Sequence, residues 1–192
     1  EYLCPNGLII DSFILNNGKT RELSNSYYDI TSLDKRRTDF VAQLPELLLN
    51  KNYINLTKRF KFRQNILSTE IEFENLGNNI IDNIDYCCTL EFALPFKVTF
   101  CDGDNNIISN TEVLTQNLCI NDEKMAFSIY IALGQKLPVT VEENEQMCLT
   151  SLGEKLFYRY TSVKIRKNLS IGPSEEDHLT IGLKVEGHRE KI

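Results

Sequence analysis

Short runs of alternating apolar and polar residues, separated by Asn, Gly and Pro, recur along this chain. The clearest run covers residues 179–186, where every second residue from Leu179 to Val185 is apolar and each neighbour is polar or Gly. Successive side chains of a β-strand point to opposite faces, so this pattern predicts a strand with one buried face. Similar runs recur at intervals of about ten residues. They predict an all-β fold, an antiparallel β-sandwich of immunoglobulin-like or jelly-roll type with roughly eight to ten strands.

A central hairpin is predicted between residues 59–63, where basic and aromatic residues alternate, and residues 70–74, where acidic and apolar residues alternate. Alternation places one set of side chains toward the core: Phe60, Phe62, Ile71 and Phe73. Pairing Arg63 with Glu70 also sets Lys61 against Glu72 and Arg59 against Glu74. Each such pair contributes about 0.2–1 kcal/mol and mainly specifies register. The alternatives are one long strand or two strands that are not neighbours.

Two segments fit either a helix or a strand. In 31–44, a Thr or Ser cap, a charged stretch and a following Pro45 are compatible with a short helix, and a strand fits equally well. In 121–133, Asn121 and Gly134 are possible helix boundaries. The aromatic and β-branched residues of 127–131 favour a strand there.

We expect one domain rather than two. No repeat, low-complexity segment or linker divides the chain, and 192 residues suffice for a single large core. The predicted organisation is an N-terminal arm at 1–7, a β-sandwich domain at 8–187 and a charged tail at 188–192.

The composition is that of an ordinary globular protein, with 42% hydrophobic and 25% charged residues. A net charge of −6 disfavours nucleic acid and anionic membranes as partners. No apolar run reaches the roughly 20 residues that span a bilayer. Lys58, Arg59, Lys61 and Arg63, interleaved with two Phe residues, resemble a nucleic-acid stacking surface, but a solvated sheet face explains them better.

The cysteines predict disulfides rather than a zinc site, because no Cys-x-x-Cys occurs and the chain has two histidines. Disulfides imply an oxidising compartment, and hence an extracellular or surface location. Adjacent residues of a strand face opposite ways, so one of two neighbouring cysteines should lie in the core and the other outside, with Cys101 a possible partner for either. The disulfide candidates are Cys4, Cys87, Cys88, Cys101, Cys119 and Cys148.

We predict no catalytic, cofactor-binding or metal-binding residues. Asp102–Asn106 begins like a calcium loop, but Ile107 replaces the glycine and Val113 the acidic residue that such a loop needs, so a hairpin turn is the better interpretation. No phosphate-binding loop, nucleophile elbow or His-Glu-x-x-His is present. Pairing Cys148 with His178 as a thiol protease has no local support, and both His178 and His188 are interpreted as solvated.

One stretch resembles a known family. Glu72–Asn78, then Ile84–Tyr86 and Leu94-Pro95, are similar to the strand, turn and strand of immunoglobulin-like conserved repeats in bacterial surface proteins. The resemblance covers roughly 40 residues. It implies an immunoglobulin-like sandwich in a surface or spore-layer protein, with no catalytic residues to carry over.

These observations together predict a non-enzymatic structural protein that self-assembles into a disulfide-stabilised surface layer or fibre, like a pilus or spore-appendage subunit. The N-terminal arm with Cys4, docking on an open sheet edge, would join subunits into a homo-oligomer or polymer. The alternative is a secreted binding module, such as an adhesin or a host-factor binder. An enzyme ranks last.

Overall fold

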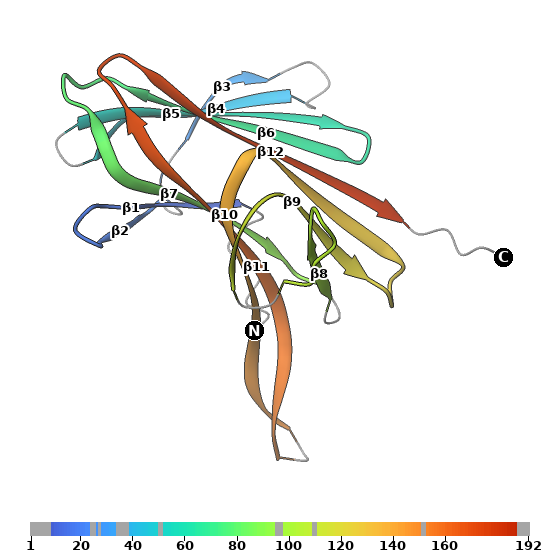
Figure 1. Ribbon diagram of the computed structural model, residues 1–192. Helices are drawn as coiled ribbons and strands as arrows, with labels where there is room; N and C mark the ends of the chain where they lie inside the picture. Colours follow the sequence, from blue (N-terminus) through green and yellow to red (C-terminus); the bar gives the residue numbers. More distant parts are fainter. Residues whose placement is uncertain are drawn as a thin grey trace.

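The computed structural model describes residues 9–23, 26, 28–33, 39–49, 52–94, 98–108, 111–150 and 153–187. This part of the chain forms twelve β-strands and no helix (Figure 1). The strands are β1 (Ile9–Ile14), β2 (Thr20–Glu22), β3 (Asp29–Leu33), β4 (Asp39–Leu49), β5 (Asn52–Arg63), β6 (Ile66–Asn75), β7 (Ile81–Phe92), β8 (Thr99–Asp102), β9 (Glu112–Asp122), β10 (Phe127–Thr150), β11 (Gly153–Ile171) and β12 (Glu176–Gly187).

All twelve strands belong to one antiparallel sheet that curls on itself. The order is β2-β1-β7-β11-β10-β12-β6-β5-β4-β3, and β9 with β8 branches from β10. The first part of β10, 127–133, pairs with β12, and the later part, 139–150, pairs with β11. β10 therefore joins the two halves of the sheet, and the pairing with β9 shifts between Ala132 and Leu137.

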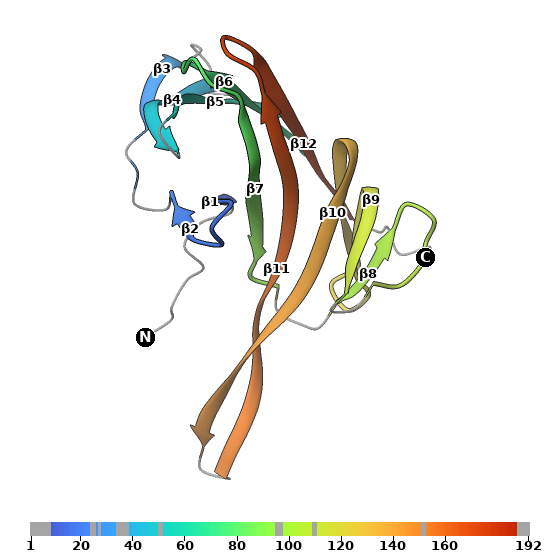
Figure 2. The same cartoon turned by 60° about the vertical axis from the view of Figure 1, so that its left-hand side comes forward.

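The two halves of the curled sheet face each other and enclose the core (Figures 1 and 2). Rings from β1, β6 and β7 meet at its centre, where the centroids of Phe73 and Tyr86 are 4.8 Å apart and those of Phe13 and Tyr86 are 5.4 Å apart. All three side chains are fully buried. The predicted all-β antiparallel fold is confirmed. The predicted division into two separate sheets is wrong, because β10 carries the hydrogen bonding continuously from one half into the other.

The β10–β11 hairpin extends beyond the body of the protein as a two-stranded ribbon (Figures 1 and 2). β9 pairs with β10 only as far as Thr140, and β7 pairs with β11 only from Thr161 onward. Among the described strands, the distal halves of β10 and β11 therefore pair only with each other.

The predicted central hairpin is confirmed as β5–β6, with a register that differs by four residues. Arg59 lies opposite Glu70 rather than Glu74, and Arg63 lies opposite Ile66. A two-residue turn starting at Gln64, which has a φ of 54°, replaces the longer loop that we expected. Because the difference is an even number, each side chain keeps the face predicted for it.

The inward face of this hairpin is as predicted at Ile71 and Phe73, which are fully buried, while Phe62 at the end of β5 remains 42% exposed. One basic residue departs from the prediction. Lys58 occupies the inward series of β5 and is buried, although its charge placed it with the solvated residues in our interpretation of the sequence.

Asn75 anchors the turn that carries the resemblance to surface repeats. It is fully buried, its amide nitrogen donates to the carbonyl oxygens of Asn79, Ile171 and Gly172, and its side-chain oxygen accepts from the Gly77 N–H. β6 and β7 on either side of this turn do not pair. β6 pairs with β5 and β12, and β7 pairs with β1 and β11. The turn therefore connects the two halves of the molecule.

The two ambiguous segments are extended wherever the structure describes them. In 31–44, residues 39–44 belong to β4 and 34–38 lie outside the described residues. In 121–133, β9 ends at Asp122 and β10 begins at Phe127, so the preference for a strand is confirmed there. The twelve strands exceed the eight to ten predicted. The arm at 1–7 and the tail at 188–192, including Cys4 and His188, lie outside the described residues.

Candidate functional site

A polar cleft lies on the outward face of the half-sheet formed by β2, β1, β7, β11 and β10. Alternation separates its side chains from the core: Asp11 and Phe13 point inward from β1, while Ile10 and Ser12 point out. The cleft has a volume of about 280 Å³. Its lining residues come from five strands and are mostly polar: Ile10, Ser12, Glu22, Thr89, Glu91, Glu142, Asn144, Tyr160, Ser162 and Lys164.

Two carboxylates flank the floor of this cleft. Glu91 on β7 and Glu142 on β10 each lie directly opposite Ser162 on β11, one on either side. Their Cα atoms are thus about two strand spacings, or about 10 Å, apart. Ser162 is only 4% exposed and forms the floor between them. The arrangement leaves a space bounded by two acidic side chains with a hydroxyl beneath it.

Hydrogen bonds and ion pairs hold several of these side chains. Lys164 Nζ lies 2.6 Å from a Glu142 carboxylate oxygen. The Asn144 side-chain amide donates to the Ser162 hydroxyl over 3.0 Å. Glu22 and Glu91 also line the cleft. Together with Glu142 they place three carboxylates beside the single Lys164 ammonium, so the cleft carries a net negative charge. The bond from Asn144 holds the buried Ser162 hydroxyl in place, so the floor of the cleft needs little reorganisation when a ligand binds.

A second hollow, of about 430 Å³, continues along the same strand. Arg166 lines it, two residues beyond Lys164 on β11 and therefore on the same face. Arg166 bonds Glu112 over 2.7 Å and lies 4.0 Å from Asp85, which also accepts from the Asn168 amide over 2.8 Å. The outward face of β11 thus carries a row of oriented polar groups that reaches from one hollow into the next.

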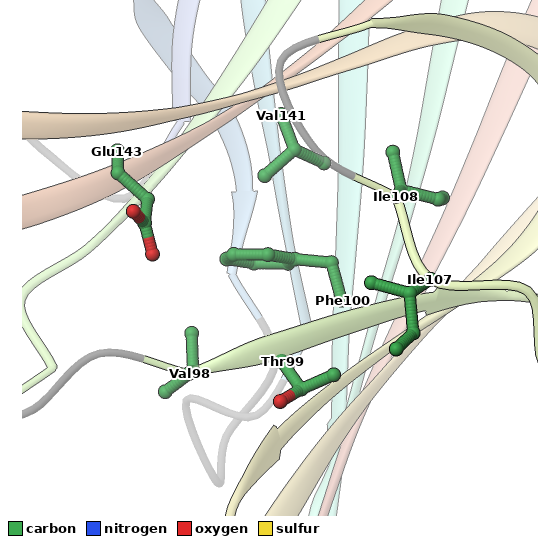
Figure 3. A pocket seen from close by; sticks show the side chains of 7 residues that line it. All are labelled: Val98, Thr99, Phe100, Ile107, Ile108, Val141 and Glu143. Atoms are coloured by element: carbon green, nitrogen blue, oxygen red, sulfur yellow. The ribbon is translucent and has the colours of Figure 1, made fainter.

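Two other hollows are predominantly apolar. Figure 3 shows the first, of about 220 Å³, where Phe100 lies at the centre, Val98, Ile108 and Val141 surround it and Glu143 extends toward it from β10. The second, of about 430 Å³, lies at one end of the core between the two half-sheets. It is lined by Phe62, Gln64, Asn65, Ile66, Leu67, Phe92, Ile129, Leu183 and Val185. Neither offers the density of hydrogen-bonding groups found in the polar cleft.

A buried ionic cluster connects the two half-sheets inside the core. The Lys58 ammonium of β5 bonds the Asp11 carboxylate of β1, which also accepts a hydrogen bond from the Tyr86 hydroxyl. The Tyr28 ring lies 4.7 Å from Lys58 Nζ. Asp11, Lys58 and Tyr86 are each less than 10% exposed, so a solute cannot reach them.

Burial also explains the protonation behaviour of this cluster. It lowers the pKa of Lys58 to about 8, although the adjoining Asp11 carboxylate favours the charged ammonium. Burial raises the pKa of Tyr86, and it raises the pKa of the neighbouring Cys88 thiol to about 12. We assign the cluster a structural role, since it ties β5 to β1 and β7 and lies behind the cleft.

The structure brings only some of the predicted disulfide candidates together. Cys88 is fully buried and Cys87 is partly exposed, so the prediction that these neighbours face opposite ways is confirmed. Cys101 lies opposite Cys119 rather than near either of them. These four are free thiols, and Cys148 lies on β10 opposite Lys155.

The remaining sequence candidates do not form a site. Asp102 caps its own turn, accepting hydrogen bonds from Asp104 and Asn106, as the hairpin interpretation predicted. His178 on β12 has a side chain that is 47% exposed, and it lies outside the lining of the polar cleft. Within the described residues, no group of three or more His, Cys, Asp or Glu side chains is arranged to hold a metal ion. The described part also contains no helix that is both long and apolar enough for a membrane span.

The cleft residues were missed from the sequence because they lie far apart in the chain, from Ile10 to Lys164. Each belongs to the polar half of an alternating strand, and such residues usually form a solvated face. Only the pairing of β7, β11 and β10 shows that Glu91 and Glu142 flank one serine.

No family model matches the chain, and no curated protein matches it. Solved structures do share its fold. The 4-alpha-glucanotransferase of Thermococcus litoralis matches 93% of this chain with a TM-score of 0.68 and 12% identity. A putative aldose 1-epimerase of Escherichia coli K12 matches 92% with a TM-score of 0.64 and 8% identity. A galactose mutarotase-like protein of Clostridium acetobutylicum matches 93% with a TM-score of 0.60 and 10% identity.

The share of those proteins that this chain spans differs. It covers 27% of the glucanotransferase and 79% of both the epimerase and the mutarotase-like protein. The matched fold is thus about four fifths of two of these proteins and about a quarter of the third.

The comparison contradicts the predicted function. The three structures above that share this fold are described as a 4-alpha-glucanotransferase, a putative aldose 1-epimerase and a galactose mutarotase-like protein. The description of the chain as a non-enzymatic fibre, surface-layer or spore-appendage subunit is corrected accordingly. The alternative of an adhesin is corrected with it. The arm-mediated contact between copies and the extracellular location stay predictions.

Proposed function

We propose that this chain is the sugar-binding domain of a carbohydrate-processing enzyme, and that the sugar occupies the polar cleft on β1, β2, β7, β10 and β11. The observation that carries the proposal is the placement of Glu91 and Glu142 on either side of Ser162. The fold shared with an aldose 1-epimerase and a 4-alpha-glucanotransferase supports it as an analogy.

The chemistry of the cleft suits a sugar. A sugar presents several hydroxyl groups, each of which both donates and accepts hydrogen bonds. Carboxylates accept such bonds, the Lys164 ammonium donates them, and the Thr89 and Ser12 hydroxyls do both. Tyr160 adds the one aromatic ring in the lining, which offers an apolar surface to the C–H groups of a sugar ring.

The same groups provide what the ring opening of an aldose requires. A base removes the proton of the anomeric hydroxyl, an acid protonates the ring oxygen, and the C1–O5 bond breaks to leave an open-chain aldehyde. Reclosure on the other face of the carbonyl gives the opposite anomer and restores both protons. In our assignment Glu91 is the proton acceptor, and Lys164, bonded to Glu142, is the donor.

The test is binding followed by turnover. Calorimetric titration with glucose, galactose and α-1,4-linked glucose oligomers should give saturable binding, which Glu91→Gln and Glu142→Gln weaken at least about tenfold, since each removes a charged hydrogen-bond acceptor. NMR exchange between α and β anomers then measures ring opening. Glu91→Gln should lower that rate more than it lowers affinity, because a base acts mainly in the transition state.

Glu123→Gln is the matched control. Glu123 is exposed in the turn between β9 and β10 and lies outside the cleft lining. If no sugar binds, or if all three Gln variants bind alike, the proposed site is wrong. Binding without anomer exchange would restrict the domain to substrate recognition and remove the assigned acid and base.

A further inference from the structure

Two cysteines lie directly opposite each other on the outer face of the β8–β9 pair. Cys101 is paired in register with Cys119. Their strand neighbours Phe100 and Ile120 are buried in the core, so the two thiols point the other way. Both are partly exposed. A small solute in water can therefore reach them.

The backbone hydrogen bonds fix the spacing of this pair. On the far side of β8, Asp102 N donates to Asn106 O over 3.0 Å and Ile108 N donates to Phe100 O over 2.8 Å, enclosing the Cys101–Ile107 bridge. The N–H and C=O groups of Cys101 itself consequently point toward β9. Cys101 and Cys119 thus form a hydrogen-bonded antiparallel pair, in which Cα atoms are about 5.5 Å apart. Disulfides span Cα separations of roughly 4.4–6.8 Å, most often about 5.5–6 Å.

The other cysteines on described strands lack such a partner. Cys87 lies opposite Ser12 and Arg166, and Cys88 lies opposite Asp11 and Ile165. In the part of the chain that the structure describes, Cys101 and Cys119 are the one pair of cysteines placed directly across from each other.

We propose that Cys101 and Cys119 are the site of a reversible intramolecular disulfide, formed by exchange with a small disulfide such as oxidised glutathione. The Cys101 thiolate attacks one glutathione sulfur and releases the first glutathione thiolate, which leaves a mixed disulfide. Cys119 then loses its proton to water and attacks the Cys101 sulfur, releasing the second. Two protein thiols are oxidised and one glutathione disulfide is reduced. Because burial raises the pKa of Cys119, the second step speeds up as pH rises.

The disulfide would fasten a short strand at an edge of the sheet. β8 has four residues, and among the named strands it pairs only with β9. Val98, Thr99 and Phe100 from this segment form one wall of the hollow in Figure 3, and Val141 and Glu143 of β10 form another. Glu142, between those two β10 residues, lines the polar cleft on the opposite face. Closing the bond would fix β8 against β9 behind that part of β10.

The experiment equilibrates the full chain in glutathione buffers of increasing oxidised fraction and maps non-reduced peptides by mass spectrometry. We expect a Cys101–Cys119 linked peptide, reversed by excess reduced glutathione, and a melting temperature about 5–10 °C higher in the oxidised form. In Cys119→Ser the reaction should stop at a glutathione adduct on Cys101, because no second thiol can displace it.

Cys87→Ser is the control, since it removes a partly exposed cysteine outside the pair and should leave the linked peptide unchanged. The inference is overturned if no linked peptide forms at any redox ratio, or if wild type and Cys119→Ser retain the Cys101 adduct equally. It is equally overturned if the linked peptide joins either cysteine to a different partner. None of these outcomes depends on whether the chain binds sugar.

Discussion

At the scale of single residues, Lys58 departs most from what its type predicts. It lies on the inward face of β5 because its position continues the alternation of Ile54 and Leu56, both fully buried. Asp11 and Tyr28 from the other side of the core compensate its charge. Removing one partner of a buried ion pair leaves the other uncompensated and typically costs about 3–5 kcal/mol.

We therefore expect Lys58→Met alone to lower the free energy of unfolding by about 3–5 kcal/mol, and the double variant Asp11→Asn/Lys58→Met to lower it much less. Urea denaturation of the four members of this cycle measures the difference. Equal losses in the single and double variants would show that Lys58 is not paired with Asp11 in solution.

The same pair predicts a pH dependence of stability. The pKa of Lys58 is about 8 when folded, against its ordinary 10.5 when unfolded. Between these two pKa values the unfolded state binds more protons than the folded state, so the free energy of unfolding rises with pH. The penalty of burying the Lys58 ammonium is fully present only below pH 8. From pH 8 to 9, wild type should gain about 1 kcal/mol over the double variant. Above pH 9 the raised pKa of Cys88 lowers the stability of wild type and double variant alike, so their difference still reports Lys58. A difference that stays constant from pH 7 to 9 would contradict the lowered pKa.

At the scale of elements, the distal β10–β11 ribbon is the strand pair with the least support from the rest of the sheet. A two-stranded ribbon in water is marginally stable, and the body of the protein supplies no third described strand to it. Its contribution to global stability should accordingly be small.

Replacing residues 146–157 with an Asn-Gly turn between Glu145 and Tyr158, which are paired, should leave the free energy of unfolding within about 1 kcal/mol of wild type. Thermal denaturation followed by circular dichroism checks this. The contrasting variant replaces residues 61–68 of the β5–β6 hairpin with the same Asn-Gly turn. It should not fold, because β6 pairs with a strand on each side. If the shortened variant unfolds, the distal β10–β11 ribbon must contribute contacts that stabilise the body of the protein.

At the scale of the whole molecule, curling of the sheet leaves one long outward face along β11. From Tyr160 to Asn168 this face extends about 26 Å, and the two polar hollows lie along it. A surface of this length can contact several linked sugars at once, whereas the cleft at Ser162 can contact only one or two.

Affinity should therefore rise with the number of linked glucose units, and Arg166→Ala should reduce the affinity for longer oligomers several-fold while leaving that for glucose unchanged. Calorimetric titration with one to six units provides the comparison. Arg59→Ala is the matched control, because Arg59 pairs with Glu72 on the opposite half of the sheet. The same affinity at every length, or an equal loss for all ligands, would confine the site to the cleft.

Much of the local structure was determined by the sequence itself. Alternation is a property of neighbouring residues, so it predicted the strands, the inward placement of Ile71 and Phe73 and the opposite faces of Cys87 and Cys88. The β5–β6 hairpin was predicted for the same reason. Its register was not, because cross-strand charge pairs are too weak to outweigh a tight two-residue turn.

Only the tertiary structure decided which strands meet. Pairing depends on contacts between segments far apart in the chain, which the order of residues does not encode locally. β6 and β7 are consecutive, yet they lie in opposite halves, and β10 changes partner along its length. The cleft exists because β7 and β10 flank β11, which places Glu91 and Glu142 on either side of Ser162. In the sequence these residues are indistinguishable from any solvated strand face, and only the pairing of the strands brings them together.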